Sequence, residues 1–232
     1  MAATAANAVQ VDIALGALQL RGVYARPAGA RGAVLFAHGS GSGRLSPRNH
    51  FVARVLQDAG FATLLFDLLT DEEQWRERET RHLRFDIALL GARLLATTRW
   101  LHARADAASL PVGYFGASTG AAAALVAAAE VASSFDAGGP RVFAVVSRGG
   151  RPDLADGALE LVCAPTLLVV GSEDHEVLEL NRRALARLLC EKALALVPGA
   201  SHLFEEPGTL AQAAQLAADW FARHVDAAGG AR

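Results

Sequence analysis

The hydrophobic residues of the chain fall into short continuous runs that alternate with longer stretches of helical spacing. Runs typical of strands covered on both faces lie at 33–37, 62–69, 111–115, 142–147, 166–170 and 193–197. Helical patterns lie at 47–58, 85–103, 118–132, 176–189 and 209–225. Alternating polar and apolar residues from Val9 to Tyr24 add a hairpin at the start. Strands that alternate with helices of this length predict right-handed crossovers and a mostly parallel sheet.

The segment Gly116-Ala117-Ser118-Thr119-Gly120 joins a predicted strand to a predicted helix. This is the pattern of a nucleophile elbow, a tight turn that holds a serine hydroxyl above the sheet. Glycines two residues on either side are needed because a side chain there would collide with the neighbouring strand and helix. The pattern predicts Ser118 as a nucleophile, and a serine that merely caps the helix is the alternative.

Two later loops place polar residues just past predicted strands. Asp174 ends the segment Gly171-Ser172-Glu173-Asp174, and His202 ends Pro198-Gly199-Ala200-Ser201-His202. Serine, aspartate and histidine in this order match the catalytic triad of α/β-hydrolases, whereas chymotrypsin-like and subtilisin-like enzymes use other orders. We therefore expect His202 to be the general base and Asp174 to orient it. The rival carboxylates are Glu173, Glu176 and Asp153.

An oxyanion hole needs two backbone N–H groups aimed where negative charge develops. We expect one from Thr119 and the other from the glycine-rich loop at 38–43, with Ser40 as the donor and Gly39 as the alternative. His38 begins this loop and is either a substrate contact or a packing residue. The loop lacks the Lys-Ser/Thr ending of a P-loop, which argues against nucleotide binding.

Two arginines and one charged segment are candidates for substrate contacts. Arg148 and Arg151 lie in a glycine-rich loop, where they would clamp a carboxylate or phosphate of the substrate. The alternative is that they are surface residues or partners of Asp153. The segment 71–84 is dense in charge and predicts either a solvated helix face or a short lid that carries Trp75 over the site.

Composition narrows the possible classes of protein. The 232 residues predict one domain over 1–232, with loose termini at 1–8 and 226–232. The formal net charge of −2 argues against a nucleic-acid partner, because such proteins concentrate a strongly basic face. The amino-terminal residues lack the features of a secretory leader, and no apolar run approaches the length of a membrane span. We therefore expect a cytoplasmic protein with no membrane partner.

The chain resembles the dienelactone hydrolase-like branch of the α/β-hydrolase superfamily. Four segments together carry this resemblance: the loop at 38–43, the elbow at 116–120, the acid loop at 171–177 and the loop at 199–202. The resemblance covers about 9–225 of the chain. It implies a three-layer fold in which helices flank an eight-stranded, mostly parallel sheet, with little or no cap. Dienelactone hydrolases proper use a cysteine nucleophile and a glutamate just past the third strand, where this chain has Ser118 and Gly39. The resemblance therefore implies a serine esterase-like reaction.

These residues predict a serine hydrolase that needs no cofactor or metal and cleaves an ester or thioester of a small acyl compound through an acyl-enzyme intermediate. Two alternatives stay open. One is an acyltransferase or perhydrolase that uses the same triad, and the other is a non-catalytic binding module on the same fold. The expected partner is a small-molecule substrate, and the expected state is a monomer or homodimer.

Overall fold

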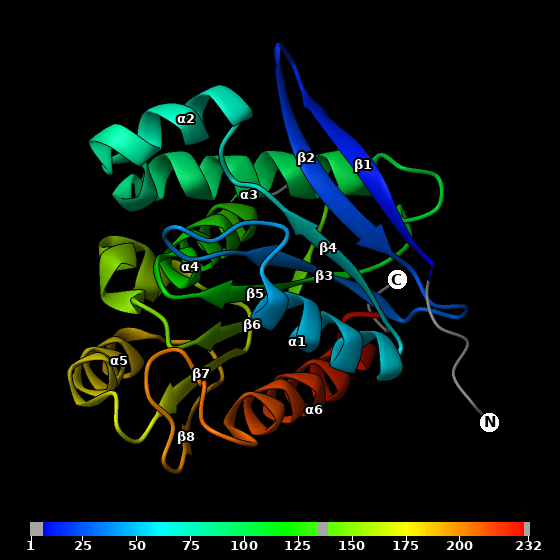
Figure 1. The fold of residues 1–232 in the computed structure, drawn as a ribbon. Helices are drawn as coiled ribbons and strands as arrows, with labels where there is room; N and C mark the ends of the chain where they lie inside the picture. The colour runs from blue at the N-terminus through cyan, green and yellow to red at the C-terminus, as the bar shows by residue number, and fades with distance from the viewer. Residues whose placement is uncertain (1–6, 134–138, 230–232) are drawn as a thin grey trace.

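The computed structural model describes residues 7–133 and 139–229 of the chain. One sheet organises them, and its eight strands follow the order β1-β2-β4-β3-β5-β6-β7-β8 (Figure 1). The strands are β1 (Ala8–Leu15), β2 (Leu18–Ala25), β3 (Gly32–Ala37), β4 (Phe61–Phe66), β5 (Val112–Ala117), β6 (Val142–Arg148), β7 (Thr166–Gly171) and β8 (Lys192–Val197). Strand β2 pairs antiparallel with β1 and β4, and the remaining pairings are parallel. The predicted α/β-hydrolase sheet is confirmed.

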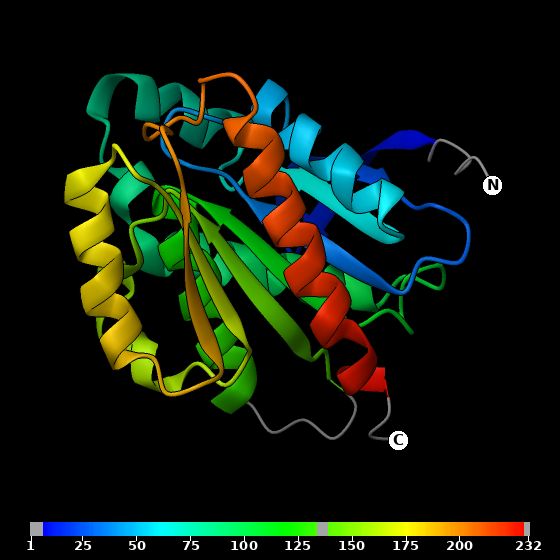
Figure 2. The same ribbon diagram turned by 90° about the horizontal axis from the view of Figure 1, so that it is seen from below.

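Helices cover both faces of this sheet. They are α1 (Pro47–Asp58), α2 (Asp71–Thr80), α3 (Ile87–His102), α4 (Thr119–Ser133), α5 (His175–Arg187) and α6 (Thr209–Gly229), with short 3-10 segments η1 (Leu83–Phe85) and η2 (Pro152–Leu161). Helices α1 and α6 lie together on one face, and α3, α4 and α5 cover the other (Figures 1 and 2). The result is the three-layer arrangement expected from the alternation of strands and helices.

The alternation of side chains along each central strand builds one core on each face of the sheet. On the α3–α4 face, Leu35, Tyr114 and Leu168 are fully buried. On the α1–α6 face, Phe36 and Phe115 pack with their ring centres 4.9 Å apart. Burial on both faces explains why these strands read as continuous apolar runs in the sequence.

Helix α4 packs closely because its buried side chains are mostly alanines. Ala121, Ala122, Ala123 and Ala124 are all 0% exposed. Small side chains bring the helix axis near the sheet, and this fixes the start of the helix just above the end of β5. The register places Ala37 beside Gly116 and Ala117 beside Arg148. The loops after β3, β5 and β6 therefore leave the same edge of the sheet as neighbours.

The chain ends differ in part from the expected loose termini. Ala8 already belongs to the sheet, since it pairs with Ala25. Helix α6 extends through Gly229, so residues 226–229 of the segment expected to be loose are helical. The remaining parts of the predicted termini, 1–6 and 230–232, lie outside the described residues.

Candidate active site

Ser118 occupies the turn between β5 and α4 with a φ of 50°. This left-handed conformation is unfavourable for a residue with a side chain and is typical of functional sites. The two flanking glycines are required by contact. A Cβ on Gly116 would lie 2.4 Å from Ala121 Cα, and a Cβ on Gly120 would lie 2.1 Å from Ala37 O. The turn thus has the geometry that the sequence predicts for a nucleophile elbow.

The imidazole of His202 contacts the carboxylate of Asp174. His202 Nδ1 lies 2.7 Å from Asp174 Oδ2. Asp174 precedes α5 as its N-cap but makes no side-chain capping bond, which leaves its carboxylate available to the histidine. The histidine side chain is 38% exposed and the aspartate 12% exposed. A carboxylate in this place holds the ring in the tautomer whose Nε2 can accept a proton.

The rival carboxylates are engaged elsewhere or make no contact with His202. Glu173 accepts a hydrogen bond of 2.9 Å from the Ser172 hydroxyl. Asp153 accepts two hydrogen bonds from Arg151, at 2.9 and 2.8 Å. Glu176 lies in the first turn of α5. Of the candidate acids, the structure therefore brings Asp174 to His202.

The turn that follows β6 contacts both the serine and the histidine. Ser118 N–H donates to Arg148 O at 3.3 Å, and Arg151 N–H donates to Ser118 O at 3.0 Å. A Cβ built on Gly149 would lie 3.1 Å from His202 O and 3.7 Å from His202 Nδ1. Within 7–133 and 139–229, the Ser118 hydroxyl forms no hydrogen bond. The backbone of Ser118 and the residue His202 thus both contact one shared turn.

Ser40 and Thr119 lie side by side at the mouth of the elbow. Their hydroxyl oxygens are 3.1 Å apart. The backbone of Gly39 lies close to Ser118, since a Cβ on Gly39 would lie 2.9 Å from Ser118 Cβ. Thr119 is the first residue of α4, and the first N–H groups of a helix have no acceptor within the helix. The two predicted oxyanion donors are therefore neighbours beside Ser118.

Both ring nitrogens of His38 form hydrogen bonds with the backbone of neighbouring segments. Its Nδ1 lies 3.0 Å from Gly39 O, and its Nε2 accepts the Leu68 N–H at 3.0 Å. This arrangement requires a neutral ring protonated on Nδ1. Burial lowers the pKa of His38 below its ordinary value, and the Gly39 carbonyl and the Asp67 charge oppose this only in part. These contacts support the packing interpretation of His38, although the ring also borders a cavity.

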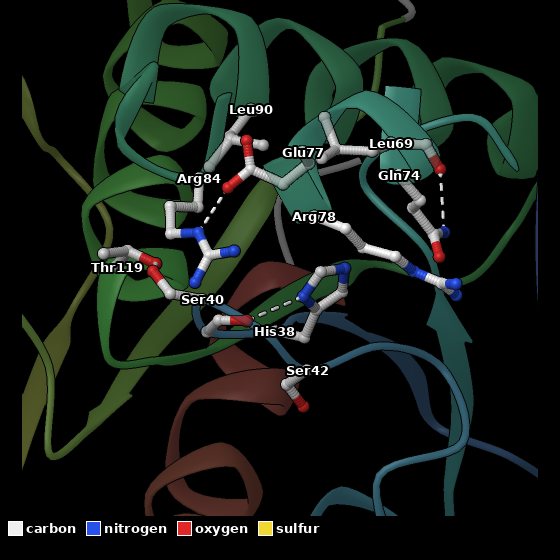
Figure 3. A pocket seen from close by; sticks show the side chains of 12 residues that line it. His38, Ser40, Ser42, Leu69, Gln74, Glu77, Arg78, Arg84, Leu90 and Thr119 are labelled. Carbon is white, nitrogen blue, oxygen red and sulfur yellow. Dashed lines mark hydrogen bonds and ion pairs between the residues drawn. The ribbon is translucent and has the colours of Figure 1, made fainter. Parts of the chain in front are cut away.

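A cavity of about 200 Å³ opens beside the proposed oxyanion donors (Figure 3). Loop residues from His38 to Ser42 and Thr119 line one side. Gln74, Glu77 and Arg78 of α2 line the other, and Arg84 points from η1 toward the loop (Figure 3). Glu77 holds Arg84 in an ion pair and accepts the Leu83 N–H at 2.7 Å, so the wall is built from a paired carboxylate and guanidinium.

Helix α2 borders the cavity, but Trp75 does not. Residues three and four apart share one face of a helix, and Gln74, Glu77 and Arg78 form the face toward the cavity. Trp75 therefore lies on another face and is 61% exposed. Trp75 does not line this cavity, and a contact between Trp75 and the substrate stays a prediction.

Arg148 and Arg151 have different surroundings. The guanidinium of Arg151 is bound by Asp153, as the alternative interpretation predicted. Arg148 is 8% exposed, and its guanidinium carbon lies 5.7 Å from the centre of the Phe204 ring. Its Nε and Nη1 are buried and bond to none of the described residues. Burial and the nearby charge of Arg48 lower the pKa of Arg148 to about 10.

Within the described chain, no three His, Cys, Asp or Glu side chains are grouped so as to hold a metal ion. No helix in that part of the chain combines the length and apolar character that crossing a bilayer requires.

The structure closely matches that of dienelactone hydrolase from Anabaena variabilis. The two chains share 55% sequence identity, the match covers 95% of this chain and 99% of the other, and the TM-score is 0.90. The chain belongs to the dienelactone hydrolase family. A dienelactone hydrolase-like promiscuous phosphotriesterase from metagenomic libraries has the same fold, with 21% identity over 95% of this chain and 99% of its own and a TM-score of 0.75.

Two proteins of Mycobacterium tuberculosis are also similar to this dienelactone hydrolase-family chain. Each is 57% identical over 218 residues, which cover 93% of this chain and 46% of the relative. The chain thus spans about half the length of these curated relatives, which carry the provisional name phosphoribosyl transferase. No family model matches the chain.

Sequence reasoning missed several residues around the site. Asp67 and Arg44 form a buried pair beside the loop of Ser40, and Glu77 and Arg84 form the far wall of the cavity. The sequence could have pointed to Asp67, because it is a single acidic residue inside the apolar run at 62–69. Glu77 and Arg84 are seven residues apart, and nothing in that spacing distinguishes a partly buried pair from solvated charges.

Proposed function

We propose that this chain is a serine hydrolase that cleaves an ester or thioester of a small acyl compound through an acyl-enzyme intermediate. The observation that carries the proposal is the shared turn after β6, which bonds to Ser118 and packs against His202 while His202 contacts Asp174. Membership of the dienelactone hydrolase family supports a hydrolase, and esterases are among its fold neighbours.

Ser118 attacks the acyl carbon in this mechanism. His202 accepts the serine proton and then gives it to the leaving group, a step worth about 10²–10⁴-fold in rate. Asp174 keeps the imidazole in the tautomer that accepts at Nε2 and stabilises the cation that forms. Water then enters, loses a proton to His202 and bonds to the acyl carbon. The bond from that carbon to the Ser118 oxygen breaks, the acid leaves, and His202 returns the proton to Ser118.

The oxyanion of each tetrahedral intermediate is bound by the N–H groups of Thr119 and Ser40. Gly39 leaves room for the loop to reach the nucleophile, because any side chain there would contact Ser118 Cβ. The start of α4 adds the partial positive charge of a helix amino terminus. One such donor contributes about 10²–10³ in rate, so these two amides provide a large part of the expected acceleration.

The cavity beside Ser40 and Thr119 supports a small acyl or alcohol group. Its volume of about 200 Å³ lies below the range of about 300–1,000 Å³ that is usual for drug-sized ligands. A panel of p-nitrophenyl esters and acyl-CoA thioesters of graded length tests the assignment. We expect turnover of short acyl groups that disappears in Ser118→Ala. Turnover unchanged in that variant would contradict the serine mechanism.

Transfer to an acceptor other than water is the second candidate reaction at the same site. An alcohol, amine or peroxide would then take the acyl group from Ser118, and product analysis with and without such acceptors separates the two outcomes. A non-catalytic role would leave the whole panel unreacted. The provisional name of the longer relatives would assign phosphoribosyl transfer instead. This chain matches about half of those relatives. Its elbow and its His202–Asp174 contact favour hydrolysis.

A further inference from the structure

A buried carboxylate lies behind the loop of Ser40. Asp67 follows the end of β4 and is 3% exposed. Its Oδ1 accepts the backbone N–H of Arg44 at 2.7 Å, and its Oδ2 pairs with the Arg44 guanidinium. Asp67 therefore binds the far end of the loop through both the backbone and the side chain of one residue.

The next residue, Leu68, binds the near end of the same loop. Its N–H donates to His38 Nε2 at 3.0 Å, and the same ring contacts Gly39 O through Nδ1. Two consecutive residues after β4 thus fix both ends of the segment from His38 to Arg44. Ser40 lies between these attachments.

Gly43 shows how closely the loop is seated on Asp67. A Cβ on Gly43 would lie 2.7 Å from Asp67 Oδ1, closer than side-chain carbons approach other atoms in proteins. Its φ is not in the left-handed region, so contact with Asp67, not backbone conformation, excludes a side chain here. A side chain at residue 43 would therefore force the loop or the Asp67 carboxylate to shift.

We infer that Asp67 is a positioning residue for the oxyanion hole, and this rests on the proposed serine hydrolase function. The Ser40 amide helps only if it lies about 2.7–3.1 Å from the developing oxyanion, and a displacement of about 1 Å can cost two orders of magnitude in rate. A carboxylate buried with its cation is weak evidence for a role in stability. The contacts of Asp67 instead converge on the loop that carries the donor.

The experiment compares Asp67→Leu with Asp67→Asn. The two side chains are similar in size, but only asparagine has an oxygen that can accept the Arg44 N–H. With a p-nitrophenyl ester that the wild type hydrolyses, we expect Asp67→Leu to lower kcat about tenfold or more while KM changes less than about twofold. The inhibition constant of a trifluoromethyl ketone, which forms an oxyanion on the serine, should rise by a similar factor. Asp67→Asn should lose less kcat than Asp67→Leu, because its amide oxygen can still accept the Arg44 N–H while its NH2 group cannot pair with the Arg44 guanidinium.

Gly43→Ala tests the same claim without changing Asp67, and it decides the question if Asp67→Leu does not fold. The added methyl should displace the loop and reproduce the loss of kcat at constant KM. Gly157→Ala is the matched control, because a Cβ there meets nothing within 4 Å. If Asp67→Leu and Gly43→Ala both keep wild-type kcat and inhibitor affinity while Ser118→Ala is inactive, the role of Asp67 is wrong and the serine mechanism stands. A wild type that reacts with neither ester nor ketone overturns both.

Discussion

His202 Nδ1 lies 2.7 Å from Asp174 Oδ2, across 28 residues of sequence. The contact joins the loop after β7 to the loop after β8, and both loops leave the sheet at the edge where Ser118 precedes α4. Because the aspartate makes no capping bond to its own helix, its carboxylate is committed to the imidazole. The pair is therefore oriented before any substrate arrives.

Asp174→Asn should lower kcat by about 10³–10⁴, because the amide permits the tautomer that cannot accept the serine proton. Glu173 should not take over, since its carboxylate is bound by Ser172. The matched control is Glu173→Gln, which should stay within about threefold of wild type. Steady-state kinetics on one p-nitrophenyl ester measures both. Equal losses in the two variants would show that the acid is misassigned.

The glycines of the elbow should be intolerant of a methyl group. Gly116→Ala and Gly120→Ala each place a Cβ against backbone atoms, at 2.4 and 2.1 Å. We expect each to reduce the free energy of unfolding by about 2–3 kcal/mol or more, because the backbone must shift. Gly157→Ala should stay within about 0.5 kcal/mol of wild type. Urea denaturation measures these changes, and a wild-type midpoint for Gly120→Ala would refute the packing of the elbow.

Arg148 should decide any preference for anionic substrates. If its guanidinium binds a substrate carboxylate, a carboxylated ester should be favoured over its neutral isostere by about ten- to a hundredfold in kcat/KM. Arg148→Met should remove that preference without loss of stability, since Nε and Nη1 are buried with no hydrogen-bond partner among the described residues. Arg151→Met should leave the preference intact because Asp153 already holds Arg151. Equal rates on both esters in the wild type would exclude the clamp.

The stability of the protein should fall as the solution becomes mildly acidic. Burial lowers the pKa of His38 and of His224 below their ordinary value of 6.5. Below about pH 6.5 the unfolded chain therefore takes up protons that the folded chain does not, and the free energy of unfolding decreases with pH down to the folded-state pKa values. His38→Gln and His224→Gln should each flatten this slope in denaturant titrations between about pH 7 and 5. A slope unchanged in both variants would contradict the assignment.

Much of the fold is predictable because a sheet buried on both faces leaves a strong signal in the sequence. The run at 33–37 and the spacing at 47–58 correspond to β3 and α1 at nearly the same boundaries. The site is partly predictable because parallel strands bring their carboxyl ends to one edge. Gly116 and Gly120 mark the elbow, and the chain order points to Asp174 and His202.

The rest depends on contacts between distant residues that periodicity does not encode. Trp75 is exposed because α2 turns another face to the cavity, and the orientation of an almost wholly polar helix cannot be read from its hydrophobic pattern. Arg81 lies four residues after Glu77, the usual spacing for a pair on one helix face, but it caps the end of α2 in the left-handed region. Glu77 therefore pairs with Arg84. The position of Asp67 under Gly43 likewise follows from how the loop folds back over β4.

The central claim is that Ser118 is an activated nucleophile, and covalent labelling tests it most directly. A fluorophosphonate probe labels a serine that a neighbouring base activates by removing its proton as the oxygen attacks. We expect mass spectrometry to find one probe per chain on Ser118, no label on Ser118→Ala, and strongly slowed labelling of His202→Ala. A wild-type chain that stays unlabelled under conditions that label a known serine esterase, or that is labelled at another serine, would contradict the account.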